Sequence, residues 1–295
     1  YVVDSQGQIS SSTFLYNEAT TGNGGGFYLM DSGPFDLSNT DFEGNDADTG
    51  SGGGMYVSGS DPALVAVTFD GNDAMLTYVD DTMGGGGLHL TDGSNATLSR
   101  CAFTDNSAAN GGGVYIANSS PALTNVAFIG NLAGDGTGGS GGGLWKDGGQ
   151  PTLKDVLFSG NRATTNGGGM HNGGAGSSVE ATNLTFSGNR AVLGTGGGLH
   201  SDASSNMIIH NTVVWSNQDS SGVGTASASI WDDPDAVIDH SLIENLALVG
   251  DGNLDGTDPG NDPLFVVPVD PSTAPTTSGL LSVKFNSPIV DVGDN

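Results

Sequence analysis

The stretch FSGNRATTNGGGMHNGG occupies residues 158–174, and a near copy, FSGNRAVLGTGGGLHSD, occupies residues 186–202. Both contain the unit F-x-x-N-x-A, followed by three glycines and an apolar residue. The unit recurs at intervals of 25 to 34 residues, beginning at Phe14, Phe42, Phe69, Phe103, Phe128, Phe158 and Phe186. A repeat of this length indicates a solenoid, in which each copy must present the same cross-section to its neighbours.

Each repeat carries three short apolar stretches that are separated by polar turns. In one copy they centre on Leu153, Phe158 and Met170. Short, evenly spaced strands without a long helical pattern are typical of an all-β solenoid. We therefore predict a right-handed parallel β-helix of about nine to ten three-strand coils over residues 1–250. Residues 251–295 hold six of the eleven prolines, so we expect an irregular capping segment of the same domain there.

Stacked coils place equivalent residues in columns along the axis. The asparagine of each unit is predicted to form a ladder in which its amide donates to one neighbouring coil and accepts from the other. Such hydrogen bonds contribute about 1 kcal/mol each. Cys101 occupies a position that is apolar in other repeats, and it is expected to be a small core residue. The ladder comprises Asn17, Asn45, Asn72, Asn106, Asn131, Asn161, Asn189, Asn217 and Asn245.

The paired motifs F-x-x-N and G-G-G-[LMFV] resemble the repeats of the polymorphic outer membrane protein family of bacterial surface β-helices. The tail stretches DPLFV (262–266) and SPIVDVGDN (287–295) are similar to the end of the repeat domain in anchored surface proteins of this kind. The resemblance covers nearly the whole chain. It implies a parallel β-helix at the bacterial surface, where many members are adhesins.

An aromatic or histidine residue follows the apolar residue after most glycine triads. Because its neighbours on both sides point inward, this position is expected to point outward. The column is a candidate binding or contact face, with three alternatives: a stacking ladder that stiffens the sheet, a sugar-binding strip, or a contact with another protein. Its members are Tyr1, Tyr28, Tyr56, His89, Tyr115, Trp145, His171, His200 and Trp231.

The chain carries 33 acidic residues against 6 basic ones, a formal net charge of −27. Such a surface repels nucleic acid and anionic membranes, and it favours cations such as calcium. No apolar run approaches the length of a membrane span. Together with a chain that starts at Tyr1, these features lead us to expect a processed protein that is extracellular or attached to a cell surface.

The stretch DGNLDGTDPGND suggests a calcium-binding loop. Asp251, Asn253, Asp255 and Asp262 fall at positions 1, 3, 5 and 12 of a D-x-N-x-D-G pattern. The alternative is a simple acidic turn, because no helical pattern flanks the loop. Calcium is therefore a candidate cofactor.

Enzyme chemistry has little support in the sequence. A calcium-dependent polysaccharide lyase or another carbohydrate-active β-helix protein is the alternative function, but basic residues for proton transfer are scarce. His171 and His200 share a face in adjacent repeats, and we expect no cysteine or paired carboxylate to complete a metal set with them. No catalytic residue is predicted.

The expected function is structural or adhesive, either a fibre subunit that assembles head to tail or a surface adhesin module. Tyr1 falls within a strand, so the first coil is expected to expose an edge that a second copy can pair with. The C-terminal segment is the expected complementary surface. The alternative is that an upstream cap has been cut off. The partners expected are the chain itself, glycans or cell-surface proteins.

Overall fold

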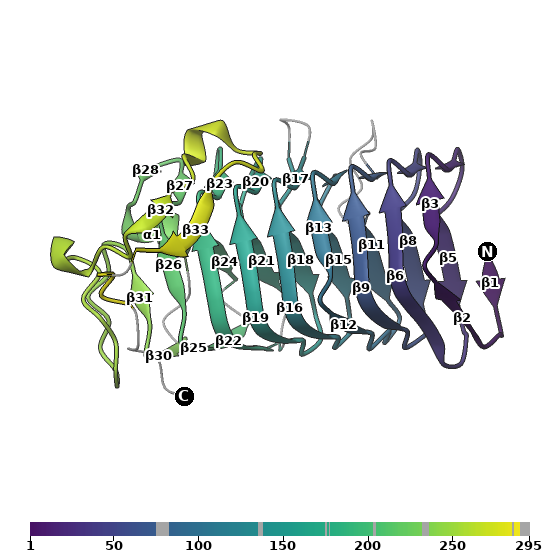
Figure 1. The fold of residues 1–295 in the computed structure, drawn as a ribbon, viewed down its shortest axis with the longest axis horizontal. Helices are drawn as coiled ribbons and strands as arrows, with labels where there is room; N and C mark the ends of the chain where they lie inside the picture. Colours follow the sequence, from purple (N-terminus) through teal and green to yellow (C-terminus); the bar gives the residue numbers. More distant parts are fainter. Residues whose placement is uncertain are drawn as a thin grey trace.

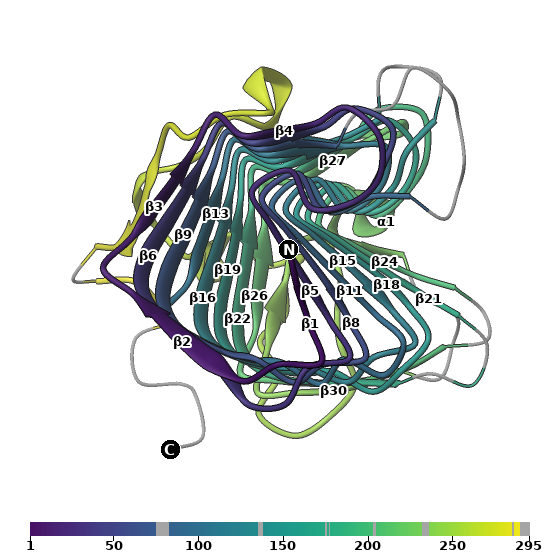
Figure 2. The same cartoon turned by 90° about the vertical axis from the view of Figure 1, so that its right-hand side faces the viewer.

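We analysed a computed structural model of the chain. It describes residues 1–74, 83–134, 138–174, 176, 178–202, 205–231, 236–284 and 286–289. In Figures 1 and 2 the chain winds around a long axis, with the strands of successive coils stacked along it. The sequence repeats thus form the coils of the predicted parallel β-helix.

Three parallel sheets form the walls of the coil stack. Sheet A contains β1 (Val2–Val3), β5 (Phe27–Met30), β8 (Met55–Ser58), β11 (Leu88–Thr91), β15 (Val114–Ala117), β18 (Leu144–Asp147), β21 (Met170–Gly173), β24 (Leu199–Ser201) and β29 (Ile230–Trp231). The path of sheet B runs through β2 (Gly7–Ser10), β6 (Phe35–Glu43), β9 (Ala63–Asp70), β12 (Thr97–Ser99), β16 (Ala122–Ile129), β19 (Thr152–Ser159), β22 (Ser178–Ser187), β25 (Asn206–His210) and β30 (Val237–Asp239). Off this path, sheet B also includes β3 (Thr13–Leu15), β13 (Ala102–Thr104), β26 (Val213–Trp215) and β31 (Leu242–Ile243).

Sheet C is built from two-residue strands at the turn after each asparagine. It contains β4 (Glu18–Ala19), β7 (Asp46–Ala47), β10 (Asp73–Ala74), β14 (Ser107–Ala108), β17 (Leu132–Ala133), β20 (Arg162–Ala163), β23 (Arg190–Ala191), β27 (Gln218–Asp219) and β28 (Gly222–Val223). Its last pair, β27 with β28, is antiparallel. A short helix, α1 (Ala226–Ser229), then leads back to sheet A. Within the described residues nine strands stack in sheet A and make about eight full turns, slightly fewer than the nine to ten coils predicted.

The phenylalanine column lies in the interior, and the register of sheet B sets its geometry. Phe128 pairs with Phe158, which pairs with Phe186. Their ring centroids lie 4.8 and 4.5 Å apart and the planes are within 4° of parallel. All three side chains are fully buried. The period of the sequence is thus the period of a continuous apolar core.

The asparagine ladder runs parallel to the phenylalanine column. The Asn161 Nδ2 group donates to Asn189 Oδ1 at 2.9 Å and to the carbonyl of Phe128 at 2.9 Å. Its Oδ1 atom accepts from Nδ2 and from the backbone N–H of Asn131. The same pattern of side-chain bonds links consecutive members from Asn17 to Asn217.

Asn245 has a different partner from the other members of the column. Its Nδ2 group donates to the carbonyl of Gly224, and the Asn217 Nδ2 group donates to the carbonyls of Phe186 and Trp215. The chain between Asn217 and Asn245 turns through β28 and α1, so the last repeat does not superpose on the others.

The glycine triads allow two segments of backbone to pass very close to each other. Gly167 adopts a φ of +66°, in the left-handed region that favours glycine. A Cβ atom at Gly168 would lie 2.4 Å from the carbonyl oxygen of Gly197 and 2.5 Å from the backbone of Arg190. Only glycine fits at this corner without moving a neighbouring coil.

The C-terminal segment has two parts. Residues 251–256 pair with the last coil: the backbone N–H of Leu254 donates to Ser241, and Asn253 Oδ1 accepts from the Ser241 N–H at 2.9 Å. Beyond η1 (Pro259–Asn261), the chain folds back along the side of the stack (Figure 1).

The returning chain forms an antiparallel pair of its own and is joined to earlier coils. The pair consists of β32 (Phe265–Val267) and β33 (Leu280–Val283), with η2 (Pro271–Thr273) between them. The Thr276 N–H donates to the carbonyl of Gly160 at 2.9 Å. The part of the tail that covers the end of the stack is therefore short, and most of the described remainder lies against its side.

Candidate functional site

The aromatic column projects from the outer side of sheet A. From Tyr1 to Tyr115 the five rings stack face to face, with centroids 4.6 to 5.2 Å apart. Trp145 is turned across the stack, at 68° to Tyr115 and 64° to His171. His171 and His200 then stack again at 4.8 Å, and the register places Trp231 next to His200.

Much of the column is not an accessible face. Tyr115 is 2% exposed and His89 is 4% exposed, and both members of the histidine pair are 6% exposed. Tyr28, Tyr56 and Trp145 are half-buried, and the two ends are open, with Tyr1 at 85% and Trp231 at 48%. In a face-to-face stack each ring covers the face of the next, so the flat surfaces that a sugar needs for stacking are occupied. Within the column, this geometry favours the stacking ladder over the sugar-binding strip.

Residues that directly precede the glycine triads contact the buried rings of His89 and His200. In Figure 2 the described parts of the chain swing outward from sheet C before they return to sheet A. His89 Nδ1 lies 3.1 Å from the carbonyl oxygen of Gly84, and Thr195 Oγ1 lies 3.0 Å from His200 Nδ1. Burial lowers the pKa of His89 to about 4. The sequence pattern predicted the outward direction, but it contained no signal for this cover.

The two stacked histidines share a carboxylate that the sequence analysis did not include. Asp202 Oδ2 lies 3.4 Å from His171 Nε2, and Asp202 Oδ1 lies 3.2 Å from His200 Nε2. Hydrogen bonds from the two imidazoles hold the pKa of Asp202 below its usual range. Burial lowers the pKa of His171.

The expectation that no carboxylate accompanies the histidine pair is therefore wrong. Asp202 lies two residues after His200, where a strand residue points to the same side of the sheet. The H-x-D spacing was the available signal. In the preceding repeat the residue two positions after His171 is Gly173, so the H-x-D spacing does not recur there.

A buried lysine lies on the inner side of the same sheet. Lys146 is fully buried in a column that is aliphatic in earlier coils, where Ile116 is its partner in register. Its Nζ atom donates to Asn172 Oδ1 at 2.8 Å, and Asn172 Nδ2 donates to Ser201 Oγ at 2.9 Å. Burial lowers the pKa of Lys146 to about 8.

This lysine predicts a pH dependence of stability. Between pH 8 and its ordinary pKa of 10.5, the unfolded chain holds a proton on Lys146 that the folded chain has released. The free energy of unfolding is therefore expected to rise as pH increases through this window. Urea denaturation in steps from about pH 7.5 to 9 measures the slope. The upper limit avoids Cys101, whose pKa burial raises above its ordinary 9.0, and Tyr56, whose pKa burial raises to about 12; both oppose the trend at higher pH.

Lys146→Met is expected to flatten this slope, and Lys154→Met is the matched control because Lys154 is exposed on β19. An unchanged slope in Lys146→Met, or an equal change in both variants, would contradict the assignment.

Three of the four side chains in the predicted calcium loop bond to separate backbone groups. Asn253 bonds to the last coil, Asp255 Oδ1 accepts from the N–H of Thr257 at 2.9 Å, and Asp262 Oδ1 accepts from the N–H of Leu264 at 2.7 Å. The structure does not gather these side chains with Asp251 around one point. Among the described residues, the single group of three metal-ligating side chains is formed by His171, His200 and Asp202.

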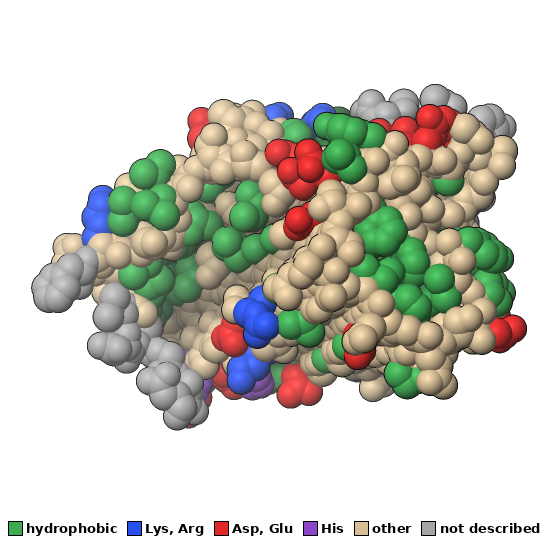
Figure 3. Space-filling view, turned by 45° about the vertical axis from the view of Figure 1, so that its right-hand side comes forward, with side chains coloured by type: hydrophobic (Ala, Val, Ile, Leu, Met, Phe, Trp, Pro, Cys, Tyr) green, Lys and Arg blue, Asp and Glu red, His purple; other side chains and the backbone are tan. Residues whose placement is uncertain are grey.

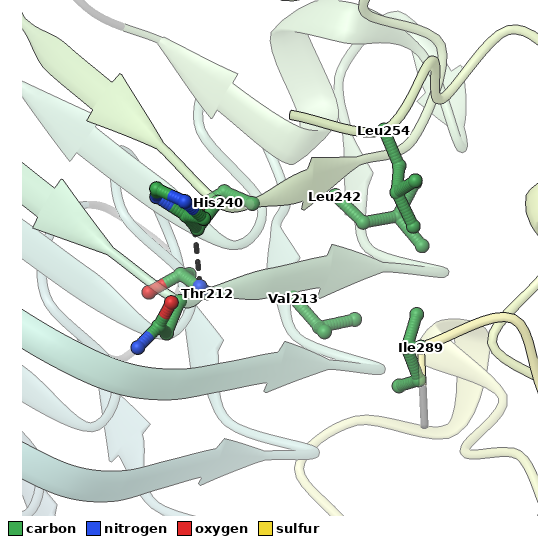
Figure 4. A pocket seen from close by; sticks show the side chains of 8 residues that line it. Thr212, Val213, His240, Leu242, Leu254 and Ile289 are labelled. Carbon is green, nitrogen blue, oxygen red and sulfur yellow. Dashed lines mark hydrogen bonds between the residues drawn. The ribbon is translucent and has the colours of Figure 1, made fainter. Parts of the chain in front are cut away.

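Two hollows lie between the coils and the C-terminal segment, in the region where apolar side chains line a recess in Figure 3. The smaller one, of about 90 Å³, is shown in Figure 4. Val213 and Leu242 form its floor on sheet B, and Leu254 and Ile289 approach from the tail. The larger one, of about 320 Å³, lies between Trp215 and the segment around Phe265. Half of the side chains that line the smaller hollow are apolar, and so are most of those that line the larger one.

The fold defines the class of this protein as a parallel β-helix with three sheets. A family model described as right-handed beta helix region matches residues 2–164, more than half of the chain. The chain therefore belongs to the right-handed β-helix family, which confirms the predicted handedness. No curated protein and no solved structure matches the chain. Among the described residues, no helix is both long and apolar enough to cross a membrane.

Proposed function

We propose that this chain is a non-catalytic structural or adhesive module of an extracellular or cell-surface protein. The observation that carries the proposal is the continuity of three ladders along the coil axis. Stacked phenylalanines fill the core, bonded asparagines line one turn, and stacked aromatic residues lie outside sheet A. Each column ties consecutive coils together along most of the stack, which makes it a stiff rod.

Two further features support this function. Acidic side chains are scattered over the face in Figure 3 and basic ones are few, in keeping with the net charge of −27. Such a surface stays soluble and repels other anionic surfaces. The paired motifs also resemble those of the polymorphic outer membrane protein family, and this supports the adhesive version of the proposal.

The first coil is the proposed site of self-association. In the strand order, β1 and β2 are terminal members of their sheets, and β3 pairs only with β6. Leu15 is 48% exposed and Tyr16 is 72% exposed on this coil. Backbone groups at an open parallel edge, together with exposed apolar side chains, favour pairing with another coil. A second copy of the chain is the proposed partner, joined head to tail through the residues 251–256 that cover its last coil.

Negative-stain electron microscopy of the chain at high concentration, with calcium, tests the proposal. Filaments or end-to-end oligomers are expected for the unmodified chain. Leu15→Glu is expected to abolish them because it places a charge on the joint. Leu193→Glu is the matched control, since Leu193 is 64% exposed but lies on a later coil.

Separate rods at all concentrations would exclude self-association through this edge and leave the adhesin version. The enzymatic alternative is tested separately, by incubating the chain with polyuronates and calcium and following the ultraviolet absorbance of unsaturated products. Turnover would overturn the non-catalytic proposal.

A further inference from the structure

The cluster formed by His171, His200 and Asp202 joins two neighbouring coils. His171 lies on β21, and His200 lies beside it on β24, with Asp202 just after that strand. One ligand atom from each residue lies within 4.8 Å of the others. Both imidazoles are buried, whereas the Asp202 side chain is 46% exposed. The cluster is therefore held by the sheet on one side and open to solvent on the other.

We propose that these three residues form a binding site for a divalent transition-metal ion of the Zn²⁺ class. Two imidazole nitrogens and one carboxylate oxygen are a donor set that such ions prefer, whereas calcium prefers oxygen alone. The proposal is independent of self-association through the first coil.

The distances already present are close to those of a coordinated ion. Ligand bonds of about 2.0 to 2.1 Å in a tetrahedral site place the donor atoms roughly 3.3 Å apart. The two nitrogen-to-oxygen distances in the cluster are near this value, 3.4 Å from His171 Nε2 to Asp202 Oδ2 and 3.2 Å from His200 Nε2 to Asp202 Oδ1. They run to the two different oxygens of one carboxylate, so a small rotation of the partly exposed Asp202 side chain would be needed for one oxygen to serve both edges. A metal would replace the two hydrogen bonds to Asp202 with two metal–nitrogen bonds and one metal–oxygen bond.

Thr195 supports the orientation of one ligand. Its Oγ1 atom lies 3.0 Å from His200 Nδ1 and can accept a hydrogen bond from an N–H group at that nitrogen. With the proton on Nδ1, the lone pair of Nε2 faces Asp202 and is free to bind a cation. A hydrogen bond from the second ring nitrogen is the usual support of a metal-binding histidine.

Gly173 leaves the space that an ion requires. A Cβ atom at this position would lie 3.1 Å from Asp202 Oδ2 and 3.3 Å from His171 Nε2. A larger residue would therefore crowd the gap between two of the ligands. Three protein ligands leave one position of a tetrahedral ion for water, as in open zinc sites.

Calorimetric titration of the EDTA-treated chain with Zn²⁺ tests the site. We expect one ion per chain. With Co²⁺ as a spectroscopic substitute, we expect the visible absorption of a four- or five-coordinate ion. Asp202→Asn removes a ligand at a partly exposed position and is expected to weaken binding at least about tenfold. Gly173→Ala keeps all three ligands and is expected to weaken binding by filling the gap.

His240→Gln is the matched control. His240 and His210 both contact Asp239 elsewhere on the rod, so this variant removes one of the chain's five histidines without touching the proposed site. Its affinity is expected to equal that of the unmodified chain. The proposal is overturned if the unmodified chain binds no ion, if Asp202→Asn binds as tightly as the unmodified chain, or if His240→Gln alone loses binding.

Discussion

Replacing Asn161 with alanine is expected to lower the free energy of unfolding by about 4 kcal/mol. The side chain is fully buried and makes four hydrogen bonds, two as a donor and two as an acceptor. Each bond contributes about 1 kcal/mol, and the loss is larger where a buried partner is left without one. Urea denaturation of the purified variant measures the change.

Asn17→Ala is the matched control for this prediction. Asn17 begins the ladder on the exposed first coil, and its side chain donates only to Asn45 Oδ1. Its loss is expected to cost about 1 kcal/mol or less. Equal effects at the two positions would show that the ladder does not stabilise the interior of the stack.

Gly168→Ala is expected to destabilise the fold by more than about 3 kcal/mol or to prevent folding. The added Cβ atom would overlap backbone atoms of the next coil, including the Gly197 carbonyl oxygen at 2.4 Å. Overpacking against a flexible side chain costs about 1 to 3 kcal/mol, and here the obstacle is backbone that is bonded into the next coil. Circular dichroism and urea denaturation give the measurement.

Gly138→Ala provides the comparison, because among the described residues, apart from its neighbours in the chain, no atom lies within 4 Å of the corresponding Cβ position. This variant is expected to be neutral, or stabilised by up to about 1 kcal/mol through a less flexible unfolded chain. A stable Gly168→Ala variant would mean that the glycine triads are not required by close packing of the coils.

The repeated motif allowed the sequence to predict the phenylalanine and asparagine columns that run through the coil stack. Aligning the F-x-x-N units already pairs Phe128 with Phe158, and the structure has that register. A parallel solenoid leaves little choice, because a slip of one residue would turn the entire core outward.

Features outside the repeated motif were harder to predict. Asp202 lies two residues after His200, where the preceding coil has Gly173, so no column of carboxylates placed it beside His171. Tyr115 is buried although its position points outward, and Gly84 of the preceding coil lies beside its ring. Such contacts leave no periodic signal in the sequence. The course of the tail beyond η1 was equally hidden, because that segment has no repeat to compare with.

The sequence pattern also contains a signal for the buried lysine, which the predictions did not include. Lys146 occupies the same strand position as Ile116, and the alignment of the glycine triads places both in the inward column. An inward charge contradicts the expected apolar pattern, and such exceptions mark positions with a special environment. Here the next two coils supply Asn172 and Ser201 to form a polar chain in the interior.

The asparagine ladder gives the rod a polarity. From Asn17 to Asn189, one side-chain N–H of each amide donates to the asparagine of the following coil, and each amide oxygen from Asn45 to Asn217 accepts from the asparagine of the preceding coil. The amide dipoles are therefore aligned head to tail, and aligned hydrogen bonds polarise and strengthen one another. A coil added in the same sense would extend the row, whereas two first coils placed face to face would oppose oxygen to oxygen. Growth of the stack is therefore expected to be vectorial, with each coil serving as a template for the orientation of the next.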